Sequence, residues 1–225
     1  MKTEIEPIAH IRSLFPTKFG IPRQSNIVEQ LPATIIFEPA YRNIEALRGI
    51  EDYDYLWLVW QFSENLRSEW SPTVRPPKLG GNQRMGVFAT RSPFRPNSLG
   101  LSSVKLLSVD LHTDEGPALH VGGADLMDGT PIFDIKPYIP YSDAHPDARS
   151  GFALNPSSRS LKVECADDIL ATIQPALRQP LLYILSQDPR PSYHTDPERI
   201  YAMPFGTNEV KFKVSDNTLT VVAIL

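Results

Sequence analysis

The chain has 225 residues, of which 41% are hydrophobic and 21% charged, a composition typical of a globular protein with one large domain or a core domain plus a small second one. No apolar run approaches the roughly 20 residues of a membrane span, and the first ten residues lack the pattern of a signal peptide. Cys165 is the only cysteine. These features exclude a membrane protein, a disulfide scaffold and a multi-cysteine zinc site, so we expect a cytoplasmic protein without a metal.

The charge is distributed unevenly along the chain. The net charge is −4, yet residues 65–105 contain seven basic residues and one acidic residue, so this segment has a charge of +6 and the remainder −10. Such a concentration of positive charge indicates a local anionic ligand, although a solvated basic loop would have the same composition. The 22 prolines predict that long helices are scarce.

Short apolar segments separated by proline and glycine make up the first two-thirds of the chain. Their length and their content of β-branched and aromatic residues predict strands. Many short strands at even spacing favour a barrel or a sandwich over a doubly wound sheet. The expected strands are Glu6–Arg12, Ala33–Phe37, Tyr55–Phe62, Met85–Thr90, Leu101–Val109, Ala118–Gly122 and Ile132–Tyr138.

The composition changes after about residue 140. Residues 141–160 resemble an exposed linker, and Asp167–Ser186 is the longest helical candidate, interrupted by Pro175 and Pro180 so that one kinked helix or two shorter helices are expected. We therefore expect a mainly β domain over residues 1–145 and a small α+β domain over residues 155–225. The strands expected in the second domain are Leu161–Cys165, Ile200–Pro204, Val210–Val214 and Leu219–Ile224.

Common catalytic motifs are absent: the sequence has no glycine-rich nucleotide loop, no HExxH, no GxSxG and no metal-ligand spacing among its five histidines. Two other stretches hold side chains that a core does not need. Pro22–Gln24 presents an arginine and a glutamine on a stiffened backbone, which suits a base edge or a carboxylate and equally a plain surface turn. Met85–Ser102 presents Arg91 and Arg95 beside two prolines, and guanidinium groups pair well with phosphates or carboxylates.

A third stretch, Asp125–Pro131, contains an Asp-Gly turn signal. A tight hairpin alone would explain Gly129, but it leaves the neighbouring Asp125 unexplained. The free backbone N–H and C=O groups of such a turn could also bind an adenine edge or a ribose. Trp57 and Trp60 lie in an apolar segment and are expected in the core, whereas Trp70 is compatible with either a core or a base-stacking role.

These stretches, in this order, resemble the TsaA-like family, whose best-known members are the TrmO-type tRNA methyltransferases. The resemblance spans nearly the whole chain, and the segment around Arg91 is its most specific part. The matching segments are Ile11–Ser13, Pro22–Gln24, Arg75–Asn82, Met85–Ser102, Asp128–Pro131, Asp134–Tyr138 and Asp188–Tyr193.

The resemblance implies a mainly β fold, with a single β-barrel that binds S-adenosylmethionine without a Rossmann fold and a small C-terminal α+β domain. It also implies a homodimer with sites near the subunit interface. The implied reaction is N6-methylation of threonylcarbamoyladenosine at position 37 of threonine tRNAs, so that the anticodon loop of tRNA is the partner. The implied cofactor contacts are Pro22, Arg23, Gln24, Ser63, Glu64, Arg91, Leu101, Asp128, Gly129, Thr130 and Pro131.

Methyl transfer from a sulfonium is mainly a matter of positioning, but the urea-like N6 must lose a proton. Asp128, Glu64 and Tyr193 are the candidate acceptors. We expect Arg75, Lys78, Arg84 and Arg95 to contact phosphates or the threonyl carboxylate. Two alternatives stay open: a non-catalytic barrel module that binds a nucleotide or RNA, and a methyltransferase with a different acceptor.

Overall fold

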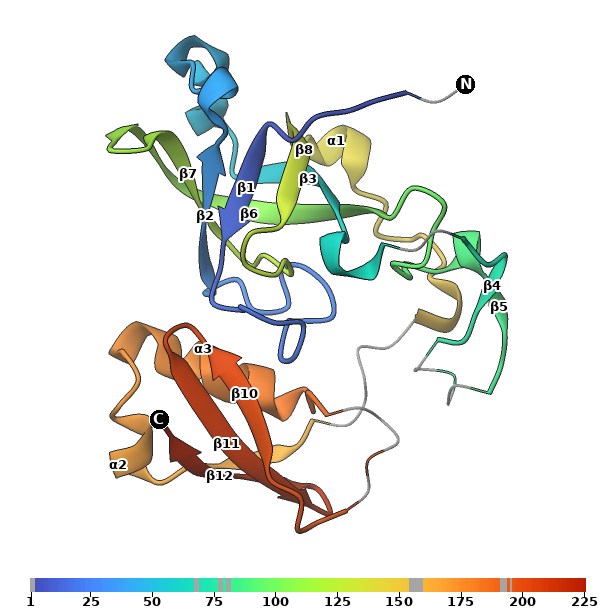
Figure 1. Ribbon diagram of the computed structural model, residues 1–225, viewed down its shortest axis with the longest axis vertical. Coiled ribbons are helices and arrows are strands. Elements are labelled where there is room, and N and C mark those ends of the chain that lie inside the picture. Colours follow the sequence, from blue (N-terminus) through green and yellow to red (C-terminus); the bar gives the residue numbers. More distant parts are fainter. Residues whose placement is uncertain are drawn as a thin grey trace.

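The computed structural model describes residues 3–66, 69–76, 79, 82–153, 160–190, 194 and 196–225. It has a barrel domain, drawn in the upper part of Figure 1, and a smaller C-terminal domain, drawn in the lower part. The barrel domain contains β1 (Ala9–Arg12), β2 (Pro32–Phe37), β3 (Tyr55–Gln61), β4 (Thr73–Val74), β5 (Met85–Gly86), β6 (Leu99–Thr113), β7 (Gly116–Gly122), β8 (Pro131–Pro137) and α1 (Pro140–Asp143).

The six longer strands close into an antiparallel barrel in the order β1-β2-β7-β6-β3-β8. Side chains alternate between the two faces of a strand, so the inward residues of β3 are Leu56, Leu58 and Trp60, which are all buried. They pack with Ile35 and Leu119 from the other side of the barrel. The expected mainly β fold with a single barrel is confirmed.

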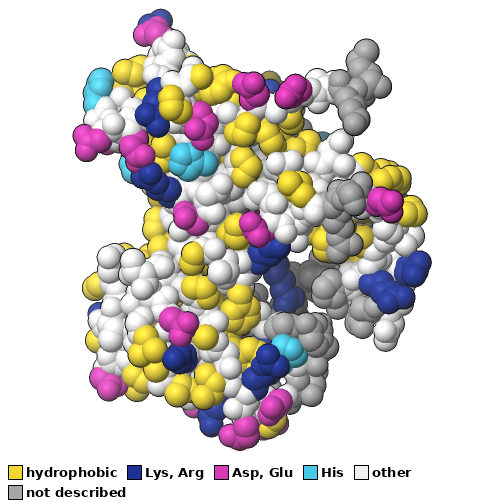
Figure 2. All heavy atoms as spheres, viewed as in Figure 1, with side chains coloured by type: hydrophobic (Ala, Val, Ile, Leu, Met, Phe, Trp, Pro, Cys, Tyr) yellow, Lys and Arg dark blue, Asp and Glu magenta, His cyan; other side chains and the backbone are white. Residues whose placement is uncertain are grey.

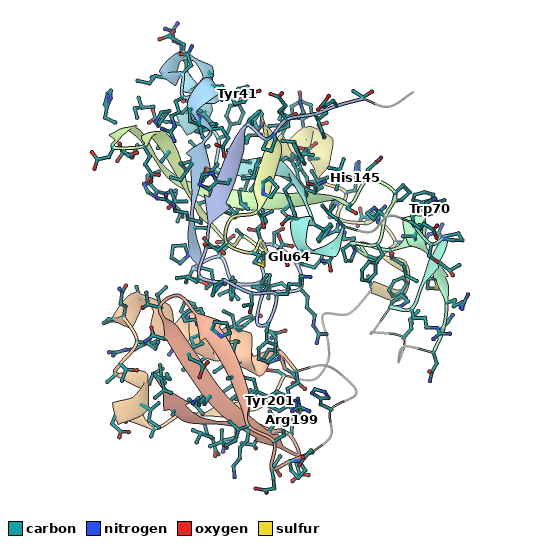
Figure 3. All side chains as sticks on the ribbon, viewed as in Figure 1. Tyr41, Glu64, Trp70, His145, Arg199 and Tyr201 are labelled. Atoms are coloured by element: carbon teal, nitrogen blue, oxygen red, sulfur yellow. The ribbon has the colours of Figure 1, made fainter. Side chains whose placement is uncertain are left out.

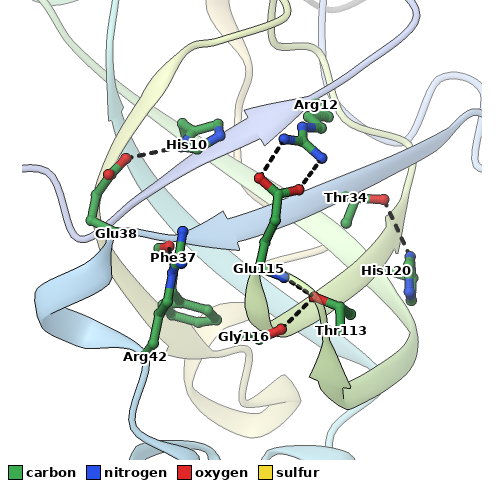
Figure 4. A network of polar contacts seen from close by, with 10 residues as sticks. All are labelled: His10, Arg12, Thr34, Phe37, Glu38, Arg42, Thr113, Glu115, Gly116 and His120. Carbon is green, nitrogen blue, oxygen red and sulfur yellow. Dashed lines mark hydrogen bonds and ion pairs between the residues drawn. The ribbon is translucent and has the colours of Figure 1, made fainter.

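Polar contacts tie neighbouring strands together on the outside of the barrel (Figure 4). Arg12 on β1 forms a bidentate ion pair with Glu115, which lies in the β6–β7 turn. His10 Nδ1 lies 2.9 Å from a Glu38 carboxylate oxygen at the end of β2. These pairs are at least partly exposed, so each contributes little to stability.

The C-terminal domain packs two helices on a four-stranded sheet of order β10-β11-β12-β9, in which only the β12–β9 pair is parallel. The expected helical segment is divided at residues 171–174, and Pro175 begins the second helix while Pro180 lies inside it. The elements are β9 (Lys162–Glu164), α2 (Asp167–Leu170), α3 (Pro175–Ser186), β10 (Tyr201–Phe205), β11 (Asn208–Ser215) and β12 (Thr218–Ile224). None of the helices in the described part of the chain is long and apolar enough to cross a membrane.

The connection from β1 to β2 joins the two domains. Phe15 is 2% exposed and its ring meets that of Phe205 edge-on, with the centroids 6.1 Å apart. Phe19 stacks on Phe212 at 6.3 Å, and the Gly206 amide donates to the Leu14 carbonyl at 2.7 Å. This connection is therefore part of the core of the C-terminal domain, although it belongs to the barrel in sequence.

Two strand predictions need correction. The segment Met85–Thr90 was expected as one strand, but only Met85–Gly86 pairs with β4, and the chain then makes a 3₁₀ turn. The β4 partner is only two residues long, so the later residues have no ladder to join. The strand expected at Leu101–Val109 continues to Thr113, because it forms a long hairpin with β7. The 3₁₀ turns in the described residues are Pro39–Tyr41, Ile44–Leu47, Ile50–Asp52, Ser63–Asn65, Val87–Ala89 and Gly151–Ala153.

Candidate functional site

A cavity of about 470 Å³ lies at the end of the barrel that faces the C-terminal domain. Three barrel connections meet there: β1 to β2, β3 to β6, and β7 to β8, which all leave the same end of the antiparallel barrel. Their contributions include Arg23, Arg91 and Thr130, so the arginine-rich turn and the Asp-Gly-Thr-Pro bend share one cavity. Of the implied cofactor contacts, those that line it are Pro22, Arg23, Gln24, Ser63, Glu64, Arg91, Leu101 and Thr130.

The segment Pro22–Gln24 reaches the cavity because the preceding residues are anchored in the C-terminal domain. Gly20 has φ +94°, and a Cβ at this position would overlap the side chain of Met203. After this turn, a guanidinium N–H of Arg23 donates to the Asp188 carbonyl at 3.3 Å. The Gln24 side-chain carbonyl accepts a hydrogen bond from Arg91. The first and second sequence motifs therefore meet directly.

Arg95 stabilises the turn that presents Arg91. Its guanidinium donates to the carbonyl of Thr90 at 2.7 Å and to that of Val87 at 3.4 Å. A charged donor on two backbone carbonyls holds a loop more firmly than a neutral one would. Arg95 also lines the cavity, and the expectation that it contacts RNA stays a prediction.

The cavity contains a carboxylate that the sequence singled out without assigning a role. The Ser102 hydroxyl donates to Asp125 at 2.6 Å and accepts from the Trp60 indole at 3.0 Å. Asp125 is partly buried, and this desolvation raises the pKa of its carboxyl above the ordinary value, while the Ser102 hydrogen bond acts in the opposite direction. Arg91 is near enough to lower that pKa electrostatically, so the site contains two facing opposite charges.

Of the four residues of the Asp128–Pro131 bend, all of which are described, Thr130 lines the cavity and Asp128, Gly129 and Pro131 do not. The Asp128 carboxylate accepts a hydrogen bond from the Ser13 amide at 2.9 Å, and Asp128 is not among the residues that line the cavity. Gly129 has φ +74°, the left-handed conformation that an Asp-Gly turn supplies, and its amide donates to the Ile11 carbonyl at 2.8 Å. Thr130 is 3% exposed and lines the cavity. The bend thus connects β1 to the cavity wall.

Glu64 and Leu101 lie at the open side of the cavity. Figure 3 shows Glu64 at the barrel end that faces the C-terminal domain, on the 3₁₀ turn after β3. Leu101 is 58% exposed although it lines the cavity. Trp57 was expected in the core but lines the cavity instead, and its indole donates to Asp143 at 2.8 Å. Trp60 is buried, as expected.

The other candidates lie away from the cavity or outside the described residues. Arg75 directly follows β4 and Arg84 directly precedes β5, and both are exposed. Trp70 is 51% exposed and its ring lies 6.0 Å from that of Phe88. Figure 3 places Trp70 far from the barrel axis, on the excursion that contains β4 and β5. Lys78 and Tyr193 fall outside the described residues.

The lining of the cavity suits S-adenosylmethionine. The methionine end of this molecule has an ammonium and a carboxylate, its sulfonium is cationic, and its adenine ring is flat with apolar faces. The cavity offers Asp125 and Glu64 to the positive groups, Arg23 and Arg91 to the carboxylate, and Trp57 to the rings. Its volume of about 470 Å³ is within the usual range for a small-molecule site. Among the described residues, no cluster of three or more histidine, cysteine or acidic side chains is placed to hold a metal ion.

Comparisons with known proteins agree with this geometry. Residues 10–144 match the tRNA-methyltransferase O N-terminal domain, and residues 159–225 match the TrmO C-terminal domain. A tRNA (adenine(37)-N6)-methyltransferase of Escherichia coli K12 is 39% identical over 98% of this chain and 97% of its own. An enzyme of the same name from Eikenella corrodens is 45% identical over 77% of this chain and 97% of its own.

A crystal structure of TrmO from Pseudomonas aeruginosa superposes with a TM-score of 0.80 at 32% identity and covers 100% of this chain and 99% of its own. Both domains are therefore shared with that structure, and so is the end of the barrel where the cavity lies. With both of its parts matched, the chain belongs to the tRNA-methyltransferase O family.

Proposed function

We propose that this protein transfers the methyl group of S-adenosylmethionine to N6 of threonylcarbamoyladenosine at position 37 of tRNA. The observation that supports this most directly is the shared cavity, to which segments separated by more than a hundred residues contribute Arg23, Arg91 and Thr130. A relative aligned over 98% of this chain has the name tRNA (adenine(37)-N6)-methyltransferase. The cofactor supplies a methyl group on a sulfonium, so the protein's contribution is to bind, orient and exclude water.

Within the cavity, the Asp125 carboxylate, which accepts from Ser102, would hold the positive end of the cofactor, and Arg91, which Gln24 orients, would bind its carboxylate. As the N6–CH₃ bond forms and the S–CH₃ bond breaks, the N6 proton goes to a nearby acceptor. We assign this role to Glu64, because it lines the cavity, whereas the Asp128 carboxylate is bound by the Ser13 amide. Asp128 and Tyr193 stay predictions as acceptors.

The test is methylation of two forms of threonine tRNA, one with and one without the threonylcarbamoyl group, followed by mass spectrometry of the nucleosides. We expect N6-methyl-threonylcarbamoyladenosine from the first and no methylated adenosine from the second. Methylation of both would show a different acceptor specificity, and no binding of S-adenosylmethionine would indicate a non-catalytic module. In single-turnover reactions, Glu64→Gln should slow transfer about 100-fold or more, whereas Asp128→Asn should not.

The RNA contacts are proposed from charge and exposure. Arg75 and Arg84 lie on the basic excursion at the ends of two paired strands, beside the exposed aromatic pair Trp70 and Phe88. Lys78 belongs to the same segment in sequence, and Arg95 faces the cavity. Each phosphate contact removed by substitution should reduce the salt dependence of tRNA binding by roughly 0.7–0.9 in slope. An unchanged slope for the Arg75→Ala and Arg84→Ala double variant would contradict this assignment.

We also propose a homodimer with the sites near the subunit interface. Leu101 lines the cavity yet is 58% exposed, and Phe88, three residues before Arg91 in sequence, is 71% exposed. A second subunit over this opening would cover apolar surface and separate the reaction from water. Light scattering of the purified protein should give the mass of two chains, and Leu101→Glu should give the mass of one. A wild-type monomer under assay conditions would exclude this proposal.

A further inference from the structure

A second and larger cavity of about 1090 Å³ lies between the barrel, the β4–β5 excursion and the C-terminal domain. Its walls are contributed by the β1–β2 connection, by the 3₁₀ turn at Val87–Ala89 and by the end of α3. Figure 2 shows basic side chains at the junction of the two domains, where the barrel meets the C-terminal domain. Among the described residues, the expected site residues that line this cavity are Pro22, Arg23, Gln24 and Arg91, and all four also line the first one.

The two cavities adjoin each other and share part of their lining. The shared residues are Lys18, Ile21, Pro22, Arg23, Gln24, Thr90 and Arg91. The hydrogen bond between Gln24 and Arg91 lies where the two cavities meet. In methyl transfer the acceptor nitrogen must lie about 3–3.5 Å from the methyl carbon, so an acceptor chamber must adjoin the cofactor cavity. The larger cavity meets this requirement.

The chemistry of the larger cavity suits a modified purine with a negative charge. Its apolar walls include Ile21, Met85 and Phe88, and its cationic side chains are Lys18, Arg23 and Arg91. The one acidic residue in its lining is Asp188, whose carboxylate is held by Arg190 in two hydrogen bonds of 2.8 and 2.9 Å. The described lining therefore has an excess of positive charge.

Lys18 is placed at the junction with neutral partners. Its ammonium donates to the Glu64 carbonyl at 2.8 Å and to the Asn65 side-chain oxygen at 3.0 Å. An ammonium has three N–H donors, so these two contacts fix its position and leave one donor for a ligand. Neither partner has a charge, so the positive charge is available to an anion in either cavity.

We propose that the larger cavity is the acceptor chamber, which takes the adenine of position 37 with its threonylcarbamoyl group, and that Lys18 binds the carboxylate of the threonine. This inference rests on the proposed function, which names threonylcarbamoyladenosine as the acceptor. It adds the place where the acceptor binds and a residue that discriminates modified from unmodified adenosine. Lys18 is a specificity residue here and does not touch the reacting atoms.

The experiment measures the kinetics of two variants on each of two substrates. The substrates are threonylcarbamoylated tRNA and the same tRNA with the threonine carboxylate converted to its methyl ester. For Lys18→Met, we expect the KM of the first substrate to rise about 10- to 100-fold, because a hydrogen bond to a charged group is lost. The KM of the ester should change less than threefold, and so should the Kd of S-adenosylmethionine. Lys136→Met, on an exposed barrel lysine paired with Asp134, is the matched control and should change none of these values.

A second pair of variants tests the chamber itself. Ala89 is exposed and lines the larger cavity but not the first, so Ala89→Trp should occupy part of it and raise the KM of both tRNA substrates without altering the Kd of S-adenosylmethionine. Ala202→Trp, at an exposed position of β10, is its control. An unchanged KM for Ala89→Trp would exclude the chamber.

The remaining outcomes separate this inference from the proposed function. If Lys18→Met weakens both substrates equally, the lysine contacts phosphate, and if it weakens S-adenosylmethionine, it belongs to the cofactor site; either result overturns the assignment. If the wild-type protein methylates threonylcarbamoylated tRNA and Lys18→Met does so equally well, the inference alone fails. If the wild-type protein methylates neither substrate, the proposed function fails first.

Discussion

Asp125 shows, at the scale of one residue, how a fold can keep a partly buried carboxylate in a cavity, where it is available to bind a cation. A carboxylate that loses solvation is destabilised unless hydrogen bonds or opposite charges compensate it. Here the Trp60 indole and the Ser102 hydroxyl form a chain of donors that ends on Asp125, and Arg91 lies opposite. The pKa of Asp125 is nevertheless raised by burial, so this compensation is incomplete. A bound cation would complete it, which is why we assign the sulfonium cofactor to this position.

Asp125→Asn should separate stability from binding. The pKa of Asp125 is higher in the folded than in the unfolded chain, so its contribution to stability is present below the unfolded pKa and is lost as the pH rises through the folded one. We therefore expect the free energies of unfolding of the variant and the wild type to be equal in acid. At pH 7 the variant should have the higher free energy of unfolding. Urea unfolding at pH 4, 5.5 and 7 measures this difference.

The same variant should bind S-adenosylmethionine about 10- to 100-fold more weakly at pH 7, because a charged contact is lost. The affinity of the wild type should fall as the pH decreases through the raised pKa of Asp125, while that of the variant should stay level. Calorimetric titration over the same pH range gives both curves. Parallel curves for the two proteins would show that Asp125 does not face the cofactor.

At the scale of elements, the cavity floor depends on the close approach of β3 and β6. Trp60 on β3 is opposite Gly100 on β6, and a Cβ at position 100 would overlap the indole ring. Glycine is therefore required here for the indole to lie flat on the strand and reach Ser102. The strand pairing thus sets the position of the Asp125 hydrogen-bond chain.

Gly100→Ala should displace the Trp60 ring from this floor. Overpacking of this kind costs about 1–3 kcal/mol, and we expect the free energy of unfolding to fall by that amount. The affinity for S-adenosylmethionine should fall with it, because Ser102 and Asp125 lose their support. Gly86→Ala is the control, since no atom lies within 4 Å of a Cβ there. Equal affinities of the Gly100→Ala protein and the wild type would contradict this role of the strand contact.

The elements differ in how well the sequence predicted them. The length of Tyr55–Phe62 and its aromatic and β-branched content are local information, and they predicted β3 almost to the residue. The composition of Met85–Thr90 is equally typical of a strand. A strand can be only as long as the partner it pairs with, and β4 has two residues. The length of the partner cannot be read from the segment itself. Pro180 was expected to interrupt the helix, yet α3 continues through it.

The same distinction applies to the site. Pro22–Gln24 and the turn around Arg91 were each recognisable by composition, and the family resemblance listed them together. Their contact through Gln24 exists only because the barrel brings the ends of β1 and β3 to one side. Lys18 had no local signal, since its role arises from two cavities that meet beside it. Asp125 had a signal in the sequence, because the Asp-Gly turn does not require an acidic residue at that position. Its hydrogen-bond partner and the arginine near it could not be recognised from the sequence.

At the scale of the whole molecule, the C-terminal domain is a support for the site rather than an appendage. Its core includes Phe15, and Gly20 packs on Met203 directly before the site residues begin. Lys18 and Pro22–Gln24 therefore have positions fixed by the second domain, although they line the cofactor cavity at the end of the barrel. Loss of that support should disturb binding without any change in the cavity residues themselves.

Phe15→Ala tests this coupling. Removing a buried phenylalanine costs about 3–5 kcal/mol, so the free energy of unfolding should fall by that amount. If the released segment then holds Pro22–Gln24 correctly for only a tenth of the time, the apparent Kd of S-adenosylmethionine rises about tenfold. Leu119→Ala is the control, because it deletes a fully buried side chain of the barrel core, costs about 2–5 kcal/mol and leaves the β1–β2 connection intact.

Both variants should be compared at a temperature where circular dichroism shows them folded, so that a difference in Kd reports the segment and not unfolding. We expect weak binding by Phe15→Ala and nearly normal binding by Leu119→Ala. Equal binding by the two would mean that the barrel alone positions Pro22–Gln24. Weak binding by Phe15→Ala alone requires that the free energy of docking the two domains also helps to shape the cofactor cavity, because the β1–β2 connection lines that cavity and packs in the core of the C-terminal domain.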